Sequence, residues 1–232
     1  MKLTKLVVSG LLLAVSGNLP AAEAHFDDQV RGDFFAGFAG DRQALDRAME
    51  SAEKAIATEP KMAAEAMSWH GAGLLTLSGR DFAQGDLAGA VELWERAVAE
   101  MDEAGKREPD NPAVLIPRAA AWFAASRTAP PEMGQPLLEK ALADYEHVYD
   151  MQKAYFDKLN IHMRSELLFG LSDGWAREGD TAKARAWFEK LAALGPESGH
   201  HDQALLYLSG EKYSVKGIGC AGCHTARQQA SK

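Results

Sequence analysis

Residues 168–196 read LFGLSDGWAREGDTAKARAWFEKLAALGP, and this stretch predicts two helices joined by a tight turn. The turn is Gly179-Asp180, because glycine ends a helix and aspartate caps the next one. The apolar side chains that follow share one helix face at i, i+3, i+4 and i+7 spacing: Ala184, Trp187, Phe188 and Leu191. The stretch is therefore predicted to be a helix–turn–helix unit with one apolar side.

A second copy of this pattern lies earlier in the chain, around Gly85-Asp86. In register with Leu168, Leu171, Ala184, Phe188 and Leu191 are Leu74, Leu77, Ala90, Trp94 and Ala97. Together with closing prolines at Pro60 and Pro196, the pattern resembles the tetratricopeptide repeat. That resemblance implies helix pairs stacked into a curved array whose concave face binds protein segments. The two turns are 94 residues apart, which is not a multiple of the usual repeat of about 34 residues. An irregular antiparallel helical bundle is the alternative.

Helical periodicity extends over the rest of the chain, whereas the alternation typical of strands is nearly absent. The sequence therefore predicts an all-α fold. The expected helices span about residues 27–38, 41–58, 61–78, 86–107, 112–127, 134–159, 162–178, 180–194 and 200–209. Pro117 falls inside one of them, where we expect it to kink the helix or to mark its first turn.

The composition excludes several classes of protein. The 232 residues are 47% apolar and 25% charged, as in an ordinary globular protein. A net charge of −8 argues against a nucleic-acid partner and against an anionic membrane surface. Only two cysteines occur, so a disulfide-dense scaffold is excluded.

The N-terminus has the features of an export signal. A basic Met-Lys-Leu-Thr-Lys start precedes about ten apolar residues from Leu6 to Val15, which are too few to span a bilayer. Small residues favour cleavage after Ala24, with Ala22 as the other choice, and an uncleaved membrane anchor is the alternative. We expect residues 1–24 to be a signal peptide and the mature protein to be periplasmic, without stable membrane insertion.

The two cysteines belong to the sequence Cys220-Ala-Gly-Cys223-His224 near the C-terminus. Two thiols at this spacing can each reach one vinyl group of a haem, and the next histidine can then reach the iron. The motif resembles the haem attachment site of c-type cytochromes. The resemblance implies one covalent haem c, with thioether bonds to Cys220 and Cys223 and with His224 as the proximal iron ligand. We expect residues 25–209 to form the helical domain and residues 210–232 the haem attachment segment.

Three other interpretations of the cysteine pair compete with a haem. A thioredoxin-like redox pair needs a βαβ unit, which the pattern lacks, and a structural disulfide would close a very small loop. A structural zinc ion needs four ligands, for which only the motif and His200-His201 are available.

Few residues follow the motif, so a second axial ligand must come from upstream or be absent. Class II cytochromes also carry the motif near the C-terminus and often leave the iron five-coordinate. The candidate distal ligands are His200, His201, His162, Met163, His147, His70 and Met67. The candidate partners for the haem propionates are Arg118, Arg127, Arg164, Lys216 and Arg227. Tyr207 and Tyr213 are placed either to pack on the haem or to complete the core of the last helix.

The sequence thus predicts an exported monohaem c-type cytochrome that transfers single electrons and docks a redox partner protein on its helical scaffold. We find no phosphate-binding loop, nucleophile elbow or zinc-protease motif, so an electron carrier is favoured over an enzyme. The alternatives are a haem enzyme or gas sensor with an open distal site, and a helical adaptor without haem whose cysteines form a disulfide.

Overall fold

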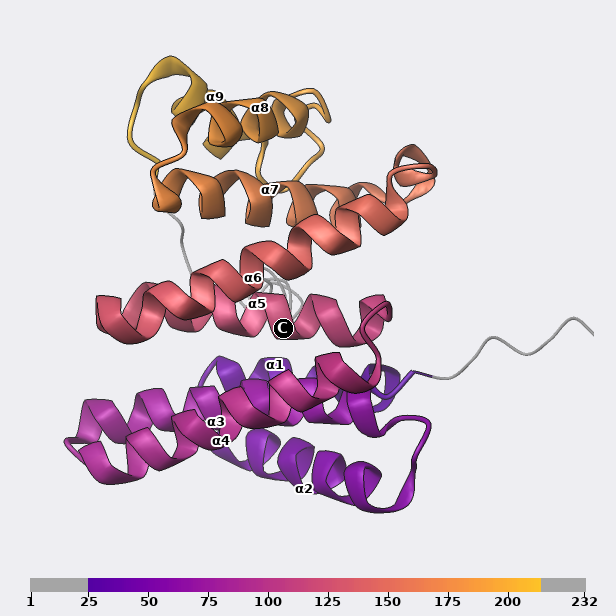
Figure 1. Cartoon of the computed structure of the whole chain (residues 1–232), viewed down its shortest axis with the longest axis vertical. Helices are drawn as coiled ribbons and strands as arrows, with labels where there is room; N and C mark the ends of the chain where they lie inside the picture. Colours follow the sequence, from indigo (N-terminus) through magenta and orange to yellow (C-terminus); the bar gives the residue numbers. More distant parts are fainter. Residues whose placement is uncertain (1–24, 214–232) are drawn as a thin grey trace, which may run out of the picture.

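The computed structural model describes residues 25–213, which form an all-α array of helices (Figure 1). In chain order the helices are α1 (Asp27–Phe38), α2 (Arg42–Thr58), α3 (Ala63–Gln84), α4 (Leu87–Arg107), α5 (Pro112–Thr128), α6 (Pro131–Gln152), the 3₁₀ turn η1 (Phe156–Lys158), α7 (Ile161–Glu178), α8 (Thr181–Ala192) and α9 (His201–Ser209). Between residues 25 and 213 there is no strand. The predicted all-α fold class is confirmed.

Two predicted helix ends are wrong by more than a turn. The helix α3 continues through Gly79 to Gln84, because the residue that ends it is Gly85 in the left-handed conformation, with φ of 86°. The helix α6 ends at Gln152, seven residues before the predicted end. The chain turns there, so that the rings of Tyr149 and Phe156 pack with their centroids 5.2 Å apart.

Successive helices form hairpins, α3 with α4, α5 with α6, and α7 with α8, and these hairpins stack along the long axis of the molecule (Figure 1). The two turns that the sequence singles out are made as predicted. Gly85 and Gly179 have positive φ angles of 86° and 82°. Asp86 and Asp180 then cap α4 and α8, and each carboxylate accepts a 3.0 Å hydrogen bond from the backbone N–H three residues later.

Apolar residues join the hairpins into a continuous array. The central cluster lies around Trp122 of α5, which is fully buried among side chains of α3 to α7. A second cluster joins α7, α8 and α9 around Leu168 and Phe188. Burial of such faces stabilises the array, since each fully buried large apolar side chain contributes about 1.5–3 kcal/mol.

Close approach of the first two helices depends on Gly37 in α1. A Cβ atom at this position would lie 2.9 Å from the Cα atom of Leu45 in α2. On the opposite, solvent-facing side of α1, Gly32 has open space around it. Only the former glycine is therefore required for packing.

None of the helices between residues 25 and 213 is long and apolar enough to cross a membrane.

Candidate functional site

The cysteine motif lies outside the described residues, as do Lys216 and Arg227. The structure therefore describes the helices that precede the motif, but not the motif itself. The last described residue is Tyr213, which follows α9 and lies seven residues before Cys220.

Tyr213 is fastened to the scaffold by a buried carboxylate. Its hydroxyl donates a 2.7 Å hydrogen bond to Oδ1 of Asp173 in α7, a residue that is only 2% exposed. The other carboxylate oxygen of Asp173 accepts a hydrogen bond from Arg127, in the last turn of α5. We call Arg127, Asp173 and Tyr213 the Asp173 cluster. It joins three segments that are far apart in sequence.

The electrostatics of the Asp173 cluster keep the Tyr213 phenol neutral. Burial raises the pKa of Tyr213, and the nearby carboxylate of Asp173 raises it further, because both disfavour a phenolate. Arg177, one turn after Asp173, donates a 2.8 Å hydrogen bond to the Ser126 hydroxyl. Burial lowers the pKa of Arg177, and the adjacent Arg127 lowers it further. The raised pKa favours the protonated phenol, which is the form that donates a hydrogen bond to Asp173.

Both tyrosines before the motif pack on α8. The Tyr207 ring is stacked on Phe188 with a centroid distance of 4.1 Å. Tyr213 contacts the same phenylalanine edge-on at 5.6 Å. Of the two placements open to them from the sequence, the structure shows the tyrosines in the core of the last helices.

Four of the candidate distal ligands gather at the other end of this region, where α7 and α9 begin. His200 is the N-cap residue of α9, and its Nε2 lies 3.1 Å from Oε1 of Glu166 in α7. Its ring is stacked on Phe169 at 4.0 Å. His162 lies 3.8 Å from the same Glu166 carboxylate. Met163 and His201 are the adjacent residues in the two helices.

Glu166 and Asp173 are seven residues apart in α7, so they lie on one face about 10 Å apart along the helix. This face of α7 therefore extends from the candidate ligands, beside Glu166, to Tyr213, beside Asp173. Two ring nitrogens at its histidine end, Nδ1 of His200 and Nδ1 of His201, are buried without a hydrogen-bond partner.

The other three candidate ligands lie on α3 and α6, where they are buried or paired. His70 of α3 is buried, and its Nδ1 lies 2.9 Å from Glu100. Met67 is buried in the small apolar cluster between α3, α4 and α5. His147 of α6 lies 2.7 Å from Asp110. The layer formed by α5 and α6 separates α3 from α7 to α9 (Figure 1).

Each described candidate for a propionate partner has a carboxylate of its own. Arg118 donates from Nε to Asp144 at 2.8 Å and lies over the Trp122 ring at 4.7 Å. Burial raises the pKa of Asp144 above its ordinary value, although Arg118 opposes the shift. Arg127 is part of the Asp173 cluster, and Arg164 lies 3.8 Å from Asp157. Arg118, Arg127 and Arg164 are thus each paired with a carboxylate of the scaffold.

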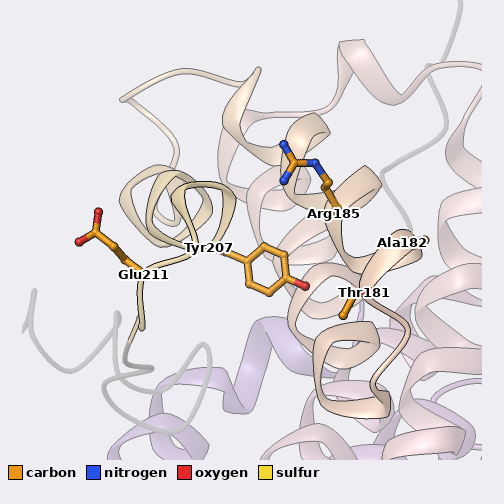
Figure 2. A pocket seen from close by; sticks show the side chains of 6 residues that line it. Thr181, Ala182, Arg185, Tyr207 and Glu211 are labelled. Carbon is orange, nitrogen blue, oxygen red and sulfur yellow. The ribbon is translucent and has the colours of Figure 1, made fainter.

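An open depression of about 450 Å³ lies between the start of α8 and the end of α9 (Figure 2). Six residues line it: Thr181, Ala182, Arg185, Tyr207, Gly210 and Glu211. Arg185 is already paired with Glu189 at 3.1 Å. No histidine or methionine is in the lining, so this depression holds none of the seven candidate distal ligands.

Within the described part of the chain, no group of three or more His, Cys, Asp and Glu side chains is arranged to hold a metal ion. No protein-family model, curated protein or solved structure matches this chain. The function of the protein is therefore inferred from the residues of the chain itself. Sequence reasoning missed Asp173 and Glu166, and the only signal for them is an acidic residue within the apolar pattern of the helix at residues 162–178.

Proposed function

We propose that this protein is an exported c-type cytochrome that carries one haem c and transfers single electrons to or from a redox partner protein. The observation that carries the proposal is the contiguous sequence Cys220-Ala-Gly-Cys223-His224. In this assignment Cys220 and Cys223 form the thioether bonds, and His224 is the proximal ligand. The haem supplies the one-electron chemistry, while the protein supplies attachment, orientation and partner docking.

Residues of the described scaffold are compatible with a haem at its C-terminal end. Cys220 follows Tyr213 by seven positions, and a chain of seven residues spans at most about 25 Å. The Asp173 cluster holds the near end of this segment on α7. Imidazole is a common axial ligand of haem iron. His200 and His201, whose Nδ1 atoms have no hydrogen-bond partner, lie at the start of α9, about two helical turns before its last residue, Ser209.

The remaining parts of the proposal concern location and docking. A signal peptide at residues 1–24, with cleavage after Ala24, directs the protein to the periplasm, where haem is attached to exported chains. The stacked hairpins offer a long surface, and the tetratricopeptide-like pattern supports its use for docking a protein segment.

The test is expression of the full chain together with the haem attachment machinery, followed by denaturing electrophoresis and haem staining. We expect a band that keeps its haem after denaturation, and loss of that haem in Cys220→Ala/Cys223→Ala. His224→Ala should abolish the native absorption spectrum, whereas the control His147→Ala, at an exposed histidine, should leave it unchanged. A colourless protein with a Cys220–Cys223 disulfide would instead identify a helical adaptor.

A further inference from the structure

We propose that His201 is the distal ligand of the haem iron, and that the outer face of α9 receives the haem carried by residues 214–232. This inference rests on the proposed function, because it assigns the second axial ligand of the same haem. It concerns a residue that the sequence places only among seven equal candidates.

Ion pairing distinguishes His201 from the other histidines. Six of the seven histidines lie among residues 25–213. Five of them face a carboxylate within 4 Å: His25, His70, His147, His162 and His200. His201 is the one described histidine with neither an ion pair nor a side-chain hydrogen bond to another described residue. No carboxylate therefore competes with iron for its ring.

Burial removes two of the paired histidines from consideration. His70 is 4% exposed and lies between Glu100 and Glu53. His200 is 9% exposed, with Nε2 held by Glu166 and Nδ1 enclosed by protein. The His201 ring, in contrast, is only partly buried, and its enclosed atom is Nδ1. Nε2 is thus the nitrogen left to bind a ligand from outside.

The surface around His201 suits an apolar macrocycle. Leu205 follows it by one helical turn on the same face of α9 and is 49% exposed. Ala204, three residues after His201, is completely buried in the cluster with α7 and α8, so His201 lies at the edge between the buried and the exposed side of α9. This edge of α9 therefore places the unpaired His201 imidazole beside a half-exposed leucine, and burial of that leucine under a porphyrin would be favourable.

Residues 214–232, which we call the tail, begin shortly after the end of α9 and are long enough to reach this face. From His201 to Ser209 the axis of α9 is about 12 Å long, at a rise of about 1.5 Å per residue. The Asp173 cluster fixes Tyr213 just beyond that end. The seven residue steps from Tyr213 to Cys220 span up to about 25 Å, which is about twice the length of α9. The tail of this chain is thus the occupant to which the geometry points.

The closing experiment uses the haem-loaded full chain and records optical and electron paramagnetic resonance spectra of the ferric protein. We expect a low-spin, six-coordinate wild type and a high-spin His201→Ala variant whose low-spin spectrum returns when imidazole is added. His201→Met should raise the reduction potential, because a thioether ligand favours ferrous iron more than imidazole does. The matched control is His147→Ala, which should keep the wild-type spectrum.

Three results would overturn the assignment. One is a low-spin spectrum that persists in His201→Ala, and a second is conversion to high spin by His162→Ala or Met163→Ala instead. The third is a wild type that is already five-coordinate, which would identify an open distal site. In the first two the haem stays covalently attached and six-coordinate, so the proposed function survives. The third keeps the covalent haem but favours a haem enzyme or gas sensor over an electron carrier. Loss of the haem itself would overturn both.

Discussion

We expect the hydrogen bond from Tyr213 to Asp173 to determine how tightly the segment after α9 is held on α7. Tyr213→Phe removes only the hydroxyl and leaves the ring on Phe188. The acceptor is a buried, charged carboxylate, and hydrogen bonds to charged groups contribute about 1.5–3 kcal/mol. Because Arg127 still pairs with Asp173 in the variant, we expect the lower end of this range, about 1.5 kcal/mol.

Limited proteolysis next to Tyr213 measures the free energy with which this segment opens. Trypsin cleaves after Lys212, an exposed residue next to the tethered tyrosine, and cleavage requires the segment to open. When opening is fast, the cleavage rate follows the equilibrium population of the open form. A loss of about 1.5 kcal/mol should therefore accelerate cleavage after Lys212 about tenfold.

The matched control is Tyr207→Phe, which removes a hydroxyl from the neighbouring ring on Phe188. No hydrogen bond from the Tyr207 side chain to a described residue is present, so cleavage after Lys212 should change less than twofold. Asp173→Ala should exceed both variants, because it removes the buried carboxylate that accepts hydrogen bonds from both the Tyr213 hydroxyl and Arg127. Equal cleavage rates for Tyr213→Phe and wild type would refute the tether.

Other substitutions test the scaffold. In α1, Gly37→Ala should lower the free energy of unfolding by about 1–3 kcal/mol through its clash with α2, whereas Gly32→Ala should be neutral or stabilise by up to about 1 kcal/mol, as measured by urea denaturation. Phe188→Ala should cost about 3–5 kcal/mol in the same assay, because the ring is completely buried. A hydrogen bond to Glu65 raises the pKa of His25 above 6.5. The stabilisation by this half-exposed pair, below about 1 kcal/mol, should be complete below pH 6.5 and lost as pH rises through the raised pKa. Unfolding of wild type and His25→Gln should thus differ at about pH 5.5 and converge at alkaline pH, above the raised pKa.

Helices were predictable because their signals are local. The spacing in Leu168–Pro196 specifies which side chains share a face, and Gly179-Asp180 specifies where one helix ends and the next begins. The errors have local causes too. Gly79 does not break α3, since glycine is tolerated within a helix that is well packed elsewhere.

The candidate site was predictable only in part. The cysteine motif is contiguous, so its chemistry can be proposed from sequence, but it gives no indication of which of seven histidines and methionines lies opposite the iron. The structure separates these candidates by their partners. It shows that His70 and His147 are paired with Glu100 and Asp110, and that His201 has no ion pair with a described residue.

By itself the sequence determined an all-α protein with two capped helix–turn–helix units and a C-terminal Cys-Ala-Gly-Cys-His segment, because helical period, caps and motif each depend on neighbouring residues. Only the tertiary structure decided that Arg127, Asp173 and Tyr213 meet, across 46 and 40 residues of chain. Such contacts depend on which helix faces stack, and that choice follows from the shape and burial of whole surfaces rather than from any local pattern.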